Sequence, residues 1–164
     1  MAVGNVPTGL AYDSSKHEMF VANNGAGTVS VISDATNSVV ATVGVGAYPV
    51  GVVYDPTKHE MFVANFGSNN TSVISDASNT VVASVAAVGY ADGVTFDSAK
   101  HEVFVADVSD DNVTVISDAT NTVVATVPVG TYDFFVMYDP SKHEVYVSND
   151  GSADVTLLGD STPV

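Results

Sequence analysis

One tripeptide, Lys-His-Glu, occurs four times at a fixed spacing and limits what this chain can fold into. Its copies begin at Lys16, Lys58, Lys100 and Lys142, so each lies 42 residues after the previous one. A period of this size without a helical pattern inside it is typical of β-propeller blades, which are four-stranded sheets arranged around an axis. The sequence therefore predicts an array of four repeats of one structural unit.

Each repeat contains four short segments that are rich in β-branched residues and separated by turn residues. In the second repeat we expect strand A at 50–54, strand B at 59–65, strand C at 71–75 and strand D at 80–85. Strands A and B are joined by Asp55-Pro56-Thr57-Lys58, in which proline presets φ and aspartate caps the backbone. The aspartate recurs in every repeat, and we interpret all four copies as turn caps: Asp13, Asp55, Asp97 and Asp139.

The predicted fold is an all-β propeller of four blades, each with about 42 residues and four strands. The blades are expected at about 6–47, 48–89, 90–131 and 132–164. The segment from Leu158 to Val164 aligns with the turn between strands C and D, so the last blade is expected to lack its outer strand. Natural proteins usually cover or pair a strand edge of this kind.

The predicted outer strands carry only small side chains. Segments 38–43, 80–85 and 122–127 consist of Val, Ala, Ser and Thr. A ring of four blades needs bulky outer side chains to fill a wide wedge, whereas eight blades turn less and pack small residues throughout their depth. We therefore expect that four blades do not close alone. The chains are expected to self-associate head to tail, either as a dimer that forms an eight-bladed ring or as a filament.

The chain is strongly acidic, with 19 Asp and Glu residues against four Lys, no Arg and a formal net charge of −15. Nucleic acid is excluded as a partner because phosphate binding needs clustered basic side chains. The same charge attracts cations. No apolar run approaches the ~18 residues of a membrane span, and the absence of cysteine excludes disulfides and thiolate metal sites.

Three segments of the first repeat carry a resemblance to a known family. Phe20-Val21-Ala22-Asn23, Thr28 to Ile32 and Asn37 to Val43 resemble the YVTN-type β-propeller repeats of archaeal surface-layer and related cell-surface proteins. The resemblance recurs about four times and covers nearly the whole chain, although the Tyr-Val-Thr-Asn of the family is Phe-Val-Ala-Asn here and Tyr-Val-Ser-Asn at 146–149. It implies an extracellular, cell-surface protein with a non-catalytic structural or adhesive role, which binds other surface proteins or glycans.

An enzymatic alternative stays open at this point. Some propellers that resemble this chain are lactonases or other hydrolases that hold Ca²⁺ in the central channel through Asp, Asn and Glu. A convergent carboxylate cluster on the axis, beside a pocket of some hundreds of Å³, would favour that alternative. No nucleophile and base recur here at a catalytic spacing. We therefore expect no enzyme and no resident cofactor, with Ca²⁺ as the one ion that a purely oxygen ligand set would suit.

The connections between the strands divide into two sets that face opposite ends of a propeller. The A–B and C–D connections form one end, which we call the turn face. They are nearly identical among repeats and carry every Lys and His, so we interpret them as scaffold. The B–C and D–A connections form the other end, the loop face, and they vary. Varied loops on a rigid framework are the usual place for binding.

The candidate binding residues on the loop face are acidic and aromatic. An acidic rim in solvent and aromatic packing between blades are the structural alternatives for them. The acidic candidates are Asp92, Asp107, Asp110, Asp111, Asp133, Asp150 and Asp154, and the aromatic candidates are Tyr48, Phe66, Tyr90, Tyr132, Phe134 and Phe135.

Two further features of the same connections yield predictions. Phe135 stands where the other repeats have Gly9, Gly51 and Gly93, so we expect it at the mouth of the central channel. Asn-x-Ser/Thr sequons make three loop-face asparagines candidates for glycosylation. They are Asn69, Asn70 and Asn112.

Overall fold

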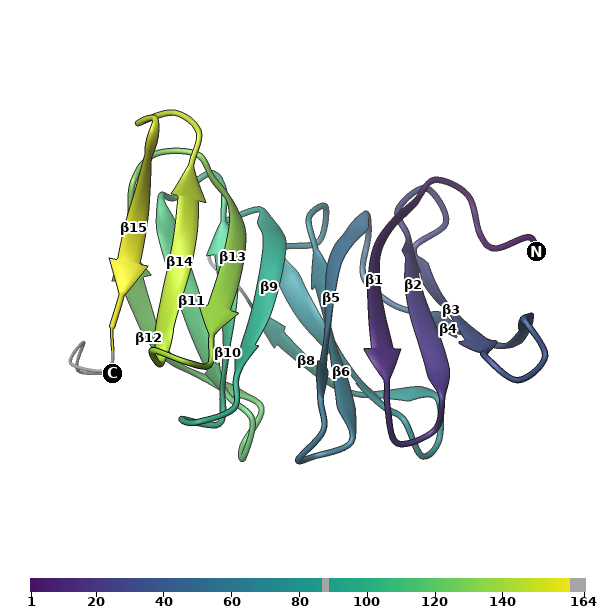
Figure 1. The fold of residues 1–164 in the computed structure, drawn as a ribbon. Helices are drawn as coiled ribbons and strands as arrows, with labels where there is room; N and C mark the ends of the chain where they lie inside the picture. Colours follow the sequence, from purple (N-terminus) through teal and green to yellow (C-terminus); the bar gives the residue numbers. More distant parts are fainter. Residues whose placement is uncertain (87–88, 160–164) are drawn as a thin grey trace.

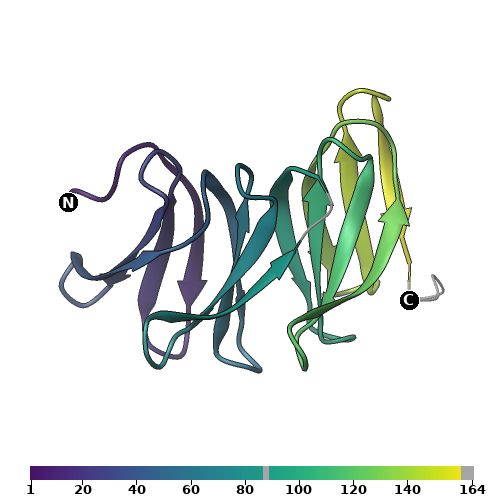
Figure 2. The ribbon, with the colours of Figure 1, turned by 180° about the vertical axis from the view of Figure 1, so that it is seen from behind.

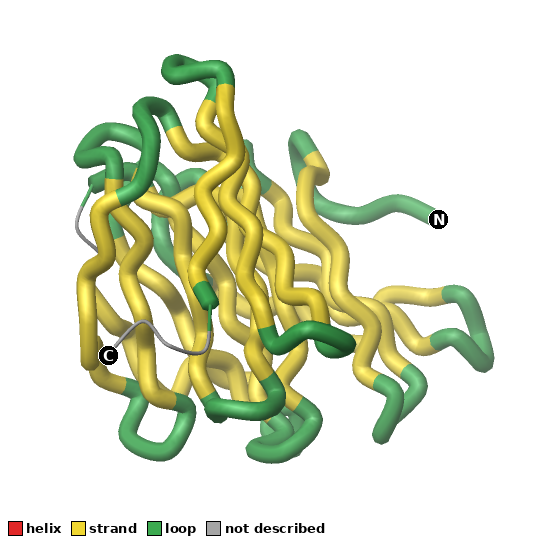
Figure 3. Tube along the Cα trace, turned by 60° about the vertical axis from the view of Figure 1, so that its left-hand side comes forward, coloured by secondary structure: helices red, strands yellow, loops and turns green. Residues whose placement is uncertain are grey.

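The computed structural model describes residues 1–86 and 89–159, and within them the chain is all β (Figure 1). The strands form four antiparallel sheets in sequence order, which we call blades 1 to 4. No helix appears in the tube view of the described chain (Figure 3), so none is long and apolar enough to cross a membrane. The predicted all-β class and the four successive blades are confirmed.

The strands of each blade follow one another from the inner edge of the sheet to the outer edge. Blade 1 contains β1 (Pro7–Asp13), β2 (Glu18–Asn23), β3 (Thr28–Ser33) and β4 (Ser38–Gly44). Blade 2 contains β5 (Pro49–Asp55), β6 (Glu60–Asn65), β7 (Asn70–Ser75) and β8 (Thr80–Ala86). Blade 3 contains β9 (Ala91–Asp97), β10 (Glu102–Asp107), β11 (Asn112–Ser117) and β12 (Thr122–Pro128). Blade 4 contains β13 (Asp133–Asp139), β14 (Glu144–Asn149) and β15 (Asp154–Leu158).

Blade 4 has three strands within the described part of the chain, in agreement with the expected lack of an outer strand. The C–D turn predicted from Leu158 onward is corrected at its first residue, because Leu158 ends β15. Residues 160–164 of that predicted turn lie outside the described residues.

The repeated tripeptide forms the turn between strands A and B. Asp55 Oδ1 accepts hydrogen bonds from the backbone N–H groups of Thr57 (2.7 Å) and Lys58 (3.3 Å), which is the predicted cap. His59 follows in the left-handed region at φ 59°, and its copies have φ values between 56° and 60°. Histidine is among the residues enriched in that region. Its Nδ1 lies 3.2 Å from a carboxylate oxygen of Asp76 in the C–D turn, so the motif ties two turns of one blade together.

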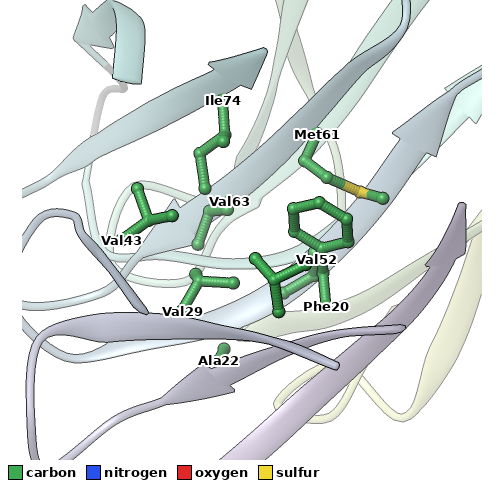
Figure 4. Close-up of a cluster of buried hydrophobic side chains, with 9 residues drawn as sticks. Phe20, Ala22, Val29, Val43, Val52, Met61, Val63 and Ile74 are labelled. Carbon is green, nitrogen blue, oxygen red and sulfur yellow. The ribbon is translucent and has the colours of Figure 1, made fainter. Parts of the chain in front are cut away.

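The hydrophobic core lies between the blades. At the first junction, Phe20 and Val29 of blade 1 pack against Met61, Val63 and neighbouring side chains of blade 2 (Figure 4). Two further clusters repeat this arrangement between blades 2 and 3 and between blades 3 and 4. A fully buried side chain of this size contributes roughly 1.5–3 kcal/mol, so the three junctions hold the array together.

The four blades form an open arc. The inner strands pack in series, β1 on β5, β5 on β9 and β9 on β13. Blade 1, in purple, and blade 4, in green and yellow, lie at opposite ends of the molecule in both views (Figures 1 and 2). Each end of the arc therefore presents one sheet face that the described part of the chain leaves without a neighbouring blade.

Candidate binding surface on the loop face

The B–C and D–A connections of the loop face lie at the top of Figure 1. A groove lined by residues of blades 2 to 4 opens on this face. We call it the loop-face groove; its volume is about 610 Å³. It combines aromatic rings with a few polar groups, the composition of many ligand sites. It is lined by Phe66, Tyr90, Val108, Ser109, Asp111, Thr131, Tyr132 and Phe134.

The tyrosines of this face stand on rigid backbone. Tyr48 and Tyr132 adopt the left-handed region at φ 52°. The carbonyl groups of Tyr48, Tyr90 and Tyr132 each accept the N–H of the residue that opens the B–C loop of their own blade, at 3.0, 3.1 and 2.9 Å. Their rings stay partly in solvent, with exposed fractions of 57%, 45% and 59%. Exposed rings on fixed backbone lose little conformational entropy when they bind.

Tyr90 differs from the other two tyrosines because of one neighbour. The rings of Tyr48 and Tyr132 lie so close to Gly67 and Gly151 that a Cβ there would meet them at 2.2 and 2.6 Å. Blade 3 has Ser109 at the equivalent position. Tyr90 instead stacks on Phe66 of blade 2, with ring centroids 4.7 Å apart and 15° between the planes. This stacked pair forms part of the lining of the loop-face groove.

Two of the predicted acidic residues are buried beneath the loop face. Asp107 ends β10, Asp133 begins β13, and both have no exposed surface. The Asp107 N–H donates to Asp133 Oδ2 at 3.0 Å, and Thr114 Oγ1 donates to Asp107 Oδ2 at 2.5 Å. Neither carboxylate belongs to an acidic rim in solvent, the structural alternative given for these candidates, because both occupy strand ends that the blade junction covers.

Burial is the main cause of the raised pKa values of Asp107 and Asp133. It raises the pKa of Asp107 to about 7, and the neighbouring charge of Asp133 adds to the increase. Burial likewise raises the pKa of Asp133 to about 6. Blades 1, 2 and 4 carry asparagine where blade 3 carries Asp107, namely Asn23, Asn65 and Asn149. Asp107 is therefore an acidic replacement at a repeated buried amide position.

The remaining acidic candidates are spread over separate places. Asp110 is exposed, and half-buried Asp111 accepts the N–H of Tyr132 at 3.0 Å. Asp150 and Asp154 are exposed and line a second hollow of about 410 Å³ with Phe134 and Phe135. Half-buried Asp92 lies on the axial side of the arc, where burial raises its pKa. Within residues 1–86 and 89–159, no three His, Cys, Asp or Glu side chains gather as a metal site.

The inner strands line a groove of about 460 Å³ on the axial side of the arc. Phe135 lies there and is 71% exposed, on the axial side where it was predicted. The equivalent glycines are required by close packing of the inner strands: a Cβ on Gly93 would lie 2.5 Å from the Phe134 carbonyl oxygen.

The three sequon asparagines differ in accessibility. Asn69 is exposed in the B–C turn of blade 2. Asn70 is half-buried, and its Nδ2 donates to Ser84 Oγ at 2.8 Å. Asn112 is half-buried too, and its Nδ2 donates to the Asp110 carbonyl at 2.6 Å. Only Asn69 among the three is both exposed and at a turn position.

Sequence reasoning placed the aromatic rings on the correct face but missed their regularity. Tyr48, Tyr90 and Tyr132 are spaced by 42 residues, so they belong to the repeat itself and not to its varied part. The same spacing relates them to Val6 in blade 1, where no ring is present. This 42-residue spacing would have identified a row of tyrosines along blades 2 to 4 from the sequence alone.

Comparisons with known proteins define the class of fold. No protein-family model matches the chain, and no curated protein gives a significant match. Among solved structures, a chain of hydrazine synthase from Kuenenia stuttgartiensis, with a β-propeller-like fold, is similar with a TM-score of 0.87 over 97% of this chain. The identity is 16%, and the match covers 48% of that chain, so this chain spans about half its length. At this identity the likeness shows the fold alone: the protein is of the β-propeller class.

Proposed function

We propose that this protein is a non-catalytic binding module of a cell surface, and that its loop-face groove binds a basic segment of another surface protein. The observation that carries the proposal is the juxtaposition of partly exposed aromatic rings with the Asp111 carboxylate in that groove. Every lysine of the chain belongs to the Lys-His-Glu turns of the opposite face, and the chain has no arginine.

The groove chemistry suits a cationic side chain. An ammonium or guanidinium group over the face of Tyr132 or Tyr90 gains roughly 0.5–2 kcal/mol from the ring. Asp110 and Asp111 lie in the turn beside these rings and supply charged acceptors. The net charge of −15 extends the attraction into solvent and speeds encounter with a basic partner.

The cell-surface part of the proposal is supported by the YVTN-type segments. The archaeal surface-layer resemblance and the extracellular location belong to the same proposal. Glycosylation at Asn69 would be compatible with binding, because Asn69 is exposed and is not among the residues that line the groove. A neutral glycan is the competing ligand, since aromatic rings and hydroxyl groups also suit sugars.

A titration by calorimetry with matched probes tests the proposal. The probes are a ten-residue lysine-rich peptide, a glutamate-rich peptide of equal length and a neutral oligosaccharide series, each at about 20 mM and 300 mM salt. We expect only the basic peptide to bind, with affinity that falls at high salt because screening weakens the charge attraction.

Variants of one ring separate groove binding from general attraction to an acidic surface. Tyr132→Ala is expected to weaken the binding of the basic peptide by roughly tenfold, or about 1.4 kcal/mol. Tyr132→Phe retains the ring face and is expected to bind like the parent protein. Equal binding by all three proteins, or salt-independent binding of the neutral oligosaccharides, would refute the proposal.

A further inference from the structure

The two ends of the arc expose the two surfaces that interlock inside it. We call the free face of blade 1 the leading face and the free face of blade 4 the trailing face. Residues on each face can be compared with their equivalents 42, 84 or 126 residues away, which lie at the inner junctions. The leading face includes Leu10, Tyr12, Met19 and Asp34, and the trailing face includes Tyr146, Ser148, Val155 and Leu157.

The leading face is a junction surface without its neighbouring blade, and it is exposed at Leu10 and half-buried at Met19 but already buried at Val21 and Ile32. Leu10 is 61% exposed, whereas its equivalents Val52 and Val136 are 9% and 7% exposed. A groove of about 500 Å³ runs over this face and is lined by Leu10, Met19 and Val21 among others. The side chain of Asp34 is 46% exposed, whereas those of Asp76 and Asp118 are only 3% and 1% exposed at the inner junctions.

The trailing face shows the complementary pattern. Val155 is 61% exposed and Leu157 is 49% exposed, whereas their equivalents in blade 1, Val29 and Val31, have no exposed surface. At the first junction, Val29 and Val31 belong to one cluster with Val52, Met61, Val63 and Ile74 of the next blade. The equivalent partners of the trailing face are therefore Leu10, Met19, Val21 and Ile32, which all line the groove on the leading face.

The residues that make polar contacts across the first junction have counterparts at the two ends of the arc. Ser15 Oγ lies 3.0 Å from Tyr54 Oη and donates to Asp76 Oδ2 at 3.3 Å, and Lys16 Nζ donates to the Asp76 carbonyl. On the trailing blade the equivalents of Ser15 and Lys16 are Ser141 and Lys142. On the leading blade the equivalents of Tyr54 and Asp76 are Tyr12 and Asp34.

We propose that the trailing face of one copy of this chain binds the leading face of a second copy, and that the same contact made twice closes two chains into an eight-bladed ring. The occupant of each face is thus a blade with the same repeat that already fills the inner junctions. A head-to-tail contact between identical chains either closes or propagates. Closure is favoured because the single arc is similar to about half of a longer propeller-like chain, at 48% coverage.

The ring would leave the loop-face groove open, because that groove lies over blades 2 to 4. It would also place two chains of charge −15 side by side. Salt screens this repulsion while the apolar contact is retained. Association is therefore expected to strengthen between about 20 mM and 300 mM salt, in contrast to the binding of a basic peptide.

Sedimentation velocity at micromolar concentration, together with light scattering, tests the proposal on the whole chain. The expected particle has twice the 16.8 kDa mass of the chain. Leu10→Asp and Leu157→Asp each place a charge on one end face and are expected to give monomers. Val82→Asp alters an equally exposed valine (52%) on an outer strand, away from both end faces, and should retain the double mass.

Mixing the two monomeric variants tests the polarity of the contact. Leu10→Asp retains an intact trailing face and Leu157→Asp an intact leading face, so the mixture should regain association through one junction. Circular dichroism must show that both variants remain folded. A monomeric parent protein, unlimited polymers, or a variant that still dimerises with only one end face intact would overturn the two-chain ring.

Discussion

Replacing Asp107 by asparagine should stabilise the protein at pH 8 and should have a smaller stabilising effect at pH 5. Asp107 is wholly buried, and burial raises its pKa from 3.8 to about 7. Between these two values the folded chain holds a proton that the unfolded chain has released. The contribution of this group to stability is therefore complete below pH 3.8 and is lost as the pH rises through about 7.

The size of the effect follows from the same change in proton affinity. A tenfold change corresponds to about 1.4 kcal/mol. Charging Asp107 is then expected to cost the folded state about 2–4 kcal/mol by pH 8, with water penetration and relaxation reducing the larger figure. Asp107→Asn removes that charge. Its amide would donate to Thr114 Oγ1, as Asn65 Nδ2 donates to Ser72 Oγ at 2.9 Å in blade 2.

Urea unfolding of both proteins at pH 5 and pH 8 measures the difference. The variant is expected to exceed the parent by about 2–4 kcal/mol in unfolding free energy at pH 8 and by about 1–2 kcal/mol at pH 5. Asp150→Asn removes one charge from an exposed position and serves as the control, with an expected change within ~0.5 kcal/mol. A gain of equal size at both pH values, or no gain at pH 8, would refute the assignment of a buried titrating carboxyl.

Three further changes test the packing and the electrostatics. Phe62→Ala removes a fully buried ring from the junction of blades 2 and 3 and should cost about 3–5 kcal/mol in urea unfolding; a loss below ~1 kcal/mol would contradict the junction core. Gly93→Ala places a Cβ 2.5 Å from a backbone oxygen of the next inner strand and should lower the melting temperature, whereas Gly44→Ala, with nothing within 4 Å, should not. Millimolar Ca²⁺ and Mg²⁺ should raise the melting temperature equally at matched ionic strength, because the loop-face carboxylates are dispersed; a rise specific to Ca²⁺ would indicate a built site.

The fold was predictable because one repeat contains nearly all the information that a blade needs. The ends of the predicted strands of the second repeat differ from those of β5 to β8 by no more than one residue. The turn caps, the lack of a fourth strand in the described part of blade 4 and the axial position of Phe135 were also accessible from the sequence. Each depends on local spacing and on turn chemistry that repeats.

The site was less predictable because burial depends on contacts between blades. Asp107 and Asp133 are next to variable loops in the sequence, yet both lie at strand ends inside a junction. The buried position was recoverable only by noticing that Asp107 replaces a repeated asparagine. The stacking of Tyr90 on Phe66 joins residues of different blades, and no spacing within one repeat reveals such a contact.

The central claim is that the varied loop face binds partners while the repeated turn face is scaffold. An amide chemical-shift titration of the isotope-labelled protein with the lysine-rich peptide tests it most directly, because it reports every region at once. The account predicts the largest shifts around Tyr90, Asp111 and Tyr132, with the amides of the four Lys-His-Glu turns unchanged. Shifts concentrated on the turns, or spread evenly over all acidic residues, would contradict it.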